Sequence, residues 1–107
     1  MISEESVELA LTWMRDHADE AAQASADVIT TKEGVATAIA MAAATSTATS
    51  AAAAEREARL TRGVQAAIEG HAAAVYRDRK MRLLYAAAEA RIAAWQTMSA
   101  NQRGMRI

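Results

Sequence analysis

Small and apolar side chains recur at alternating spacings of three and four residues from the N-terminus to about residue 44. This heptad spacing is typical of a helix that packs along one stripe against another helix. The predicted stripe comprises Val7, Leu11, Met14, Ala18, Ala21, Ser25, Val28, Val35, Ile39 and Ala42, with Ala10, Trp13 and Ala22 beside it. Because Ser3 precedes the acidic pair Glu4 and Glu5, we expect the helix to begin there, with Ser3 as its N-cap.

This first helix has one weak point in its sequence. Thr30 and Glu33 have the spacing of a capping box, which would begin a new helix. The heptad stripe nevertheless continues in register on both sides of this segment. We therefore predict one helix over about 4–44 with a bend near Gly34, and a break within 30–34 is the alternative.

The segment 45–50 contains only Thr, Ser and Ala, and it interrupts the pattern as a predicted turn. Ser50 is expected to cap a short helix over about 51–58. A second long helix follows over about 60–101, and Gly104 is expected to end it. The stripe of this helix comprises Val64, Ala67, His71, Ala74, Met81, Tyr85, Ala88, Ile92 and Trp95.

Two long helices of similar length that are joined by a turn predict an antiparallel, coiled-coil-like hairpin with the short helix at its tip. The absence of Pro and of alternating strand patterns agrees with an all-α class. We expect a single domain over 1–107. Folding the chain at the turn places Trp13 and Met14 against Ile92 and Trp95, whereas Ala faces Ala in the middle of the hairpin.

The composition predicts a thin core. Thirty of the 107 residues are Ala and none is Phe, so the chain has high helix propensity but little apolar area to bury. Small chains with thin cores usually need oligomerisation, and we expect a homodimer that completes a four-helix bundle. Trp13 and Trp95 are predicted to anchor the core, or to anchor an interface if that end of the bundle meets a partner.

Charge is distributed unevenly along the chain. Residues 1–54 carry eight acidic and two basic side chains, whereas residues 55–107 carry ten basic and five acidic ones, although the net charge is only -1. Such asymmetry indicates either two halves that pair with each other or one half that meets a polyanion.

One run in the second half concentrates the positive charge. We call it the basic strip, and it comprises Tyr76, Arg77, Arg79, Lys80 and Arg82. The strip could bind the phosphates of single-stranded DNA while Tyr76 stacks on a base. The favoured interpretation is a solvated helix face whose bases pair with acidic side chains across the hairpin. The chain as a whole is acidic, whereas domains that bind nucleic acid are usually basic. The acids expected to meet it are Asp19, Glu20 and Asp27.

No pattern typical of catalysis or of cofactor binding is present in the sequence. The chain lacks Cys, and His17 shares a helix face with Glu20 but has no second His four residues on, so we expect no metal, no cofactor and no enzymatic activity. No apolar run approaches the length of a membrane span, and the acidic N-terminus lacks the features of a signal peptide. We therefore expect a cytoplasmic protein that does not bind membranes.

Three segments resemble a family of small helical proteins in tailed bacteriophages and prophages. They are Arg15–Ala18 (RDHA), Ser50–Glu57 (SAAAAERE) and Ala90–Asn101 (ARIAAWQTMSAN). The family pattern has a YLRD helix, an SAAAxERE short helix and a closing AxARIExWRSxxAxxR helix. The chain departs from it at Ala94, where an acid is usual, and at Gln96, where Arg is usual. Because such genes often lie among those for recombination and replication, the resemblance implies a cytoplasmic accessory role in phage DNA metabolism.

The sequence thus predicts a non-enzymatic accessory protein that acts by binding other macromolecules. Its expected partners are a second copy of itself and a further protein, and single-stranded DNA is the less favoured partner. Two alternatives remain open. One is an inhibitor of a host defence or of a host nucleic-acid enzyme, in which the acidic first helix would occupy a nucleic-acid site. The other is a component of the virion or of its assembly.

Overall fold

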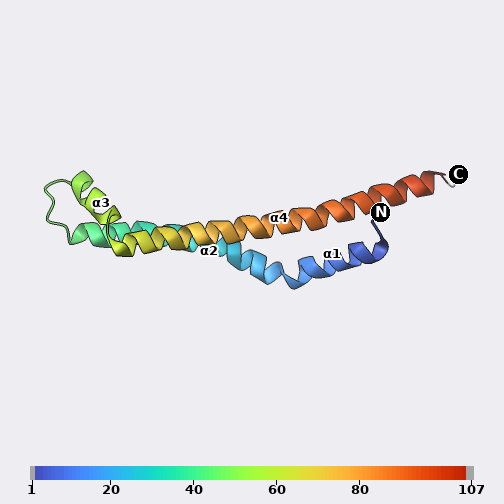
Figure 1. Ribbon diagram of the computed structural model, residues 1–107, viewed down its shortest axis with the longest axis horizontal. Coiled ribbons are helices and arrows are strands. Elements are labelled where there is room, and N and C mark those ends of the chain that lie inside the picture. Colours follow the sequence, from blue (N-terminus) through green and yellow to red (C-terminus); the bar gives the residue numbers. More distant parts are fainter. Residues whose placement is uncertain (1, 106–107) are drawn as a thin grey trace. The chain divides into compact units, whose positions relative to one another are not determined.

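In the computed structural model, which describes residues 2–105, the chain folds into helices joined by short connections (Figure 1). The helices are α1 (Glu4–Asp16), α2 (Ala18–Ala44), α3 (Ala51–Arg59) and α4 (Arg62–Met105). No strand occurs among the described residues. The predicted all-α class is therefore confirmed, and so are the turn over 45–50 and the short helix after it.

Both predicted N-caps are present. The Ser3 hydroxyl oxygen accepts a hydrogen bond from the backbone N–H of Ser6 at 3.1 Å. The Ser50 hydroxyl oxygen accepts one from the N–H of Ala53, also at 3.1 Å. Each cap satisfies an amide that has no partner within its helix, which typically stabilises the helix by about 1 kcal/mol.

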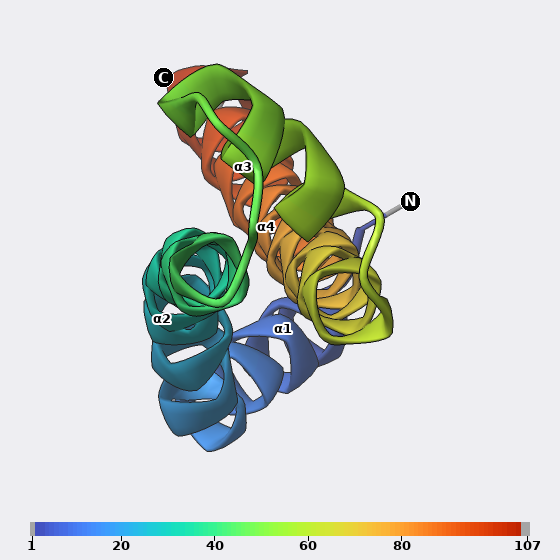
Figure 2. The ribbon, with the colours of Figure 1, turned by 90° about the vertical axis from the view of Figure 1, so that its left-hand side faces the viewer.

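The short helix α3 is held by contacts on both sides of the turn. Figure 2 looks onto this end of the molecule, where the connection passes from α2 to α3 and then into α4. Ala58 is buried, and the Ser46 hydroxyl donates a hydrogen bond to the carboxylate of Glu57. The Gln65 side chain also donates to the carbonyl of Arg59 at 2.7 Å, which ties the end of α3 to the first turns of α4.

The prediction of one helix over 4–44 is wrong at one position, because the helix is divided at His17. His17 has φ -105° and ψ 6°, outside the helical region. Its ring Nδ1 lies 2.8 Å from the carbonyl oxygen of Trp13, which also accepts the backbone N–H of His17 at 3.1 Å. A side chain that competes for a helix carbonyl in this way favours a local departure from the helix.

A contact from α4 compensates for the interruption. The carbonyl of Met14 would bond the N–H of Ala18 in a continuous helix, and this bond is absent at the break between the described helices α1 and α2. The Tyr85 hydroxyl donates to the Met14 carbonyl instead, at 2.5 Å. The Met14 carbonyl therefore stays hydrogen-bonded, and the break does not carry the free-energy cost of an unpaired carbonyl.

The weak point that the sequence indicates at 30–34 does not interrupt α2. Thr30 donates its hydroxyl hydrogen to the carbonyl of Ala26, four residues earlier in the same helix. Because that hydroxyl bonds back into its own helix, it does not cap a new one. The capping-box alternative is therefore wrong.

Gly104 does not end the last helix either, since α4 continues to Met105. A glycine ends a helix when it adopts a left-handed conformation, and no described glycine has a positive φ. Gly34 likewise lies within α2. A single glycine inside a helix costs about 1 kcal/mol relative to Ala, which tertiary packing readily offsets.

The contacts within the chain divide it into two compact units. Within the described residues, the first unit comprises residues 2–22 and 79–105, and the second comprises residues 23–78. In the second unit α2 and α4 are antiparallel, because their bonded pairs are Ser25–Asp78, Asp27–Arg77 and Thr31–His71. In the first unit α1 runs antiparallel to the later part of α4 (Figure 1).

The predicted stripe of α4 is confirmed, since each of its nine side chains is buried or half-buried. The stripe of the first half is confirmed at eight of its ten positions, whereas Leu11 and Ala18 are exposed. Ala10 is buried and His17 half-buried in their place. Residues three and four positions apart share a helix face. The pattern therefore could not decide between Ala10 and Leu11, or between His17 and Ala18.

The core is thin, as the composition predicts. The buried apolar side chains are Val7, Ala10, Ala24, Ala58, Val64, Ala74, Met81 and Ala88. Five of these eight are Ala, so the helices approach closely but each contact buries little apolar area.

The predicted contact of Trp13 with Trp95 is wrong. Trp13 packs instead against Tyr85, edge to face, with ring centroids 5.2 Å apart. Tyr85 precedes the expected partner Ile92 by seven residues. Counting residues from the turn assumes one uninterrupted helix, and the break at His17 removes that assumption for α1.

Candidate interaction surface

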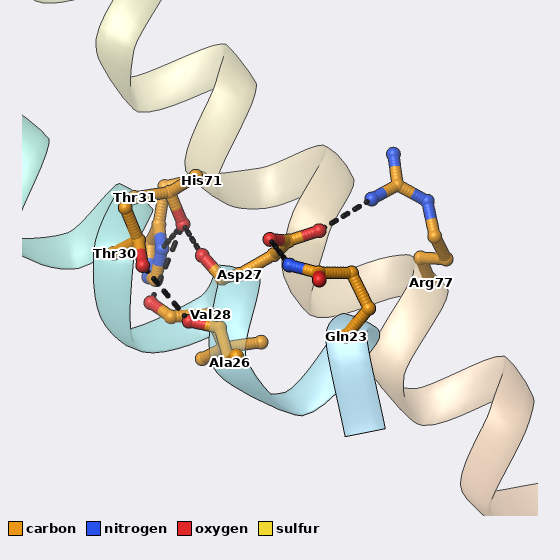
Figure 3. Close-up of polar contacts among 8 residues, drawn as sticks. All are labelled: Gln23, Ala26, Asp27, Val28, Thr30, Thr31, His71 and Arg77. Atoms are coloured by element: carbon orange, nitrogen blue, oxygen red, sulfur yellow. Dashed lines mark hydrogen bonds and ion pairs between the residues drawn. The ribbon is translucent and has the colours of Figure 1, made fainter. Parts of the chain in front are cut away.

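The residues of the basic strip lie on α4 but have different environments. Tyr76 is 71 % exposed. Arg77 forms an ion pair with Asp27, at 3.5 Å between Nη1 and Oδ2 (Figure 3). Arg79, Lys80 and Arg82 are exposed, and Arg82 also has an interaction partner. The interpretation that the basic strip pairs with acidic side chains of the first half is thus confirmed for Arg77 and Asp27.

Asp27 is the centre of a polar cluster in the second unit (Figure 3). Its carboxylate also accepts the side-chain amide of Gln23 at 2.7 Å. Its backbone carbonyl accepts the Thr31 hydroxyl at 2.6 Å. Because that hydroxyl has one proton, the 2.9 Å contact between Thr31 and His71 Nδ1 requires Nδ1 to donate. The cluster joins α2 to α4 by two contacts, Asp27–Arg77 and Thr31–His71.

Replacing Thr31 by Val is expected to lower the free energy of unfolding by about 1 kcal/mol, because it removes a part-buried hydroxyl and leaves His71 Nδ1 unpaired. Thr30→Val is the matched control, since its hydroxyl is exposed and bonds only within α2. Urea denaturation of both variants measures the difference. Equal losses for the two would mean that the bond to His71 contributes nothing.

An open, largely apolar groove of about 500 Å³ lies between α1 and α4 in the first unit. Its lining residues are Leu9, Ala10, Thr12, Trp13, Asp16, His17, Leu84, Ala87, Ala88 and Arg91. Ala10 and Ala88 are buried and form the floor. Leu9 and Leu84 stand at the sides, 64 % and 43 % exposed. A concave apolar surface with few polar groups is the usual form of a binding site.

The two Trp residues that the sequence identifies as anchors have separate positions. Trp13 is half-buried in the groove wall and stacks on the His17 ring, with centroids 4.5 Å apart and an interplanar angle of 22°. Trp95 is half-buried on α4 and does not line the groove. The structure therefore does not bring the two predicted anchors together.

Sequence reasoning missed the groove, although a signal for it was present. Leu9 and Trp13 are four residues apart on α1, beside the stripe that packs on α4. Leu84, Ala87 and Arg91 have the same three- and four-residue spacing on α4. Each helix therefore carries a second stripe along one face, next to the stripe that forms the core.

Within the described residues, no three or more His, Cys, Asp or Glu side chains gather where they could hold a metal ion. His17 and His71 instead contact the Trp13 carbonyl and the Thr31 hydroxyl. Among the described helices, none combines the length and the apolar character that crossing a membrane requires.

The fold and the groove define an all-α chain with an open apolar surface between paired helices. No protein-family model, curated protein or solved structure matches this chain. The resemblance to a phage family therefore rests on the three sequence segments alone.

Proposed function

We propose that this chain is a non-enzymatic, phage-derived accessory protein that acts by binding macromolecules in phage DNA recombination or replication. It associates with a second copy of itself and with a further protein. Binding is supported by the structure's apolar surfaces, and the setting in phage DNA metabolism by the sequence resemblance.

One observation carries the proposal: in the second unit small apolar side chains are buried, while several large ones face outward. In the second unit the buried side chains are Ala24, Ala58, Val64 and Ala74. The side chains that are more than two-thirds exposed there include Ile29, Met41 and Leu60. Large apolar residues are normally the ones a fold buries. Covering one such side chain would contribute roughly 1.5–3 kcal/mol, which favours a partner that covers several.

Single-stranded DNA remains the less favoured partner. Tyr76, Arg79 and Lys80 are exposed and suit phosphate binding and stacking. Arg77 is engaged with Asp27, so fewer charges of the basic strip are available for phosphates than the sequence alone indicates.

Binding to a short labelled single-stranded oligonucleotide tests this part of the proposal through fluorescence anisotropy at increasing salt. If Arg79 and Lys80 each neutralise one phosphate, the log–log slope of affinity against salt should be about -1.4. Arg79→Ala with Lys80→Ala should abolish that slope, whereas Arg62→Ala, an exposed base outside the strip, should not. Absence of binding at about 50 mM salt would exclude DNA as a partner.

The biological setting is tested by cross-linking the tagged protein in phage-infected cells and identifying what is attached to it. A phage recombination or replication protein supports the proposal. Capture of a single host enzyme would instead support the inhibitor alternative. Recovery of the protein in purified virions would support a role in assembly.

A further inference from the structure

We propose that the groove of the first unit is an interface in which the same groove of a second copy lies antiparallel to it. Leu9 of each copy then packs against Leu84 of the other, and Asp16 of each copy meets Arg91 of the other. The inference rests on the self-association proposed above and names its surface and orientation.

The groove of the first unit is largely apolar. Two paired helices cover each other along one stripe only, and the groove beside that stripe remains open. Trp13, Leu9 and Leu84 line it, while its floor consists of Ala side chains that let another helix approach closely. A large aromatic side chain above a floor of small ones is a suitable centre for a helix–helix interface.

Two charged side chains, Asp16 and Arg91, line the groove. Since α1 and α4 are antiparallel in this unit, Arg91 lies toward the Leu9 end of the groove and Asp16 toward the Leu84 end. Neither charge has an ion-pair partner among the described residues. The groove thus has a basic end, an apolar middle and an acidic end.

This order of charges selects both the occupant and its orientation. A second copy related by a twofold axis places each basic end against the acidic end of its partner, so that Leu9 and Arg91 of one copy meet Leu84 and Asp16 of the other. A parallel copy would set Arg91 against Arg91 and Asp16 against Asp16, which is unfavourable. The groove is therefore complementary to itself in the antiparallel orientation.

The decisive experiment is charge reversal in the full-length chain, followed by sedimentation velocity over a range of concentrations. Asp16→Arg and Arg91→Glu should each weaken self-association at least about tenfold, because each turns two attractive contacts of the dimer into repulsive ones. An equimolar mixture of the two variants should regain the parent affinity, since both contacts are again between opposite charges. The double variant should regain it as well.

Two controls separate interface effects from folding. Circular dichroism should show the parent helix content in each variant. Glu69→Arg reverses an exposed charge in the second unit and should leave self-association unchanged.

Three results would overturn the inference, and they are distinguishable. If both single variants associate like the parent, the groove is not the interface, although self-association stands. If the mixture and the double variant stay weak, the antiparallel pairing is wrong. If the parent chain is monomeric at about 100 μM, self-association fails together with the inference.

Discussion

Replacing Met81 by Ala is expected to lower the free energy of unfolding by about 2–5 kcal/mol. Met81 is only 6 % exposed and is the largest side chain among the buried residues of α4. The other buried positions in its unit are Val7, Ala10 and Ala88. Because these small neighbours have few atoms with which to fill the space, the cavity left by the substitution should remain largely open.

Met41→Ala is the matched control for this prediction. Both methionines lie inside long helices, so the change in helix propensity is the same, but Met41 is more than two-thirds exposed. Its replacement should change stability by less than about 0.5 kcal/mol. Urea denaturation at one fixed protein concentration measures both, because self-association would make stability concentration-dependent. Similar losses for the two variants would mean that Met81 does not belong to the core.

The sequence predicts helices and their ends well where the evidence is local. Ser3 and Ser50 cap helices because a short polar side chain can reach amides in the next turn, which requires nothing from the rest of the chain. The stripe of α4 is correct because its three- and four-residue spacing recurs over nine positions, with a single gap between Ala74 and Met81. Such features can be predicted from neighbouring residues alone.

The errors arise where a contact distant in sequence decides between local choices. At the break at His17, the Met14 carbonyl accepts the hydroxyl of Tyr85 from another helix. Asp78 is another example, since it occupies the gap that the predicted stripe leaves between Ala74 and Met81. It is half-buried there because it accepts the Ser25 hydroxyl at 2.8 Å. A charged residue does not look like a core position until its partner is known.

The candidate site was likewise predictable only where local sequence decides the outcome. Exposure of Tyr76, Arg79 and Lys80 follows from their place opposite the stripe on α4. The pairing of Arg77 with Asp27 agrees with one of two interpretations of the basic strip, and the antiparallel register of α2 and α4 brings these two side chains together. The groove could not be predicted without knowing which residues of α1 pack against α4. The break at His17 shifts this pairing from the predicted one.

Besides the bulk of Met81, the close approach of helices at Ala positions determines the stability of this fold. Ala74 is 2 % exposed on α4, and the antiparallel pairs on either side of it place α2 against it. A larger side chain at this position has no space to occupy unless the two helices separate. Separation would also lengthen the contacts of the polar cluster around Asp27.

Replacing Ala74 by Leu is therefore expected to lower the free energy of unfolding by about 1–3 kcal/mol, although it adds apolar surface. The neighbouring Ala73 is exposed on the same helix, so Ala73→Leu has the same helix propensity change without the overpacking and should be nearly neutral. Thermal and urea denaturation of the pair measure the difference. If Ala74→Leu stabilised the protein as much as a buried Leu normally does, the helices would have room to spare at this position. The thin Ala core would then be under-filled rather than closely packed.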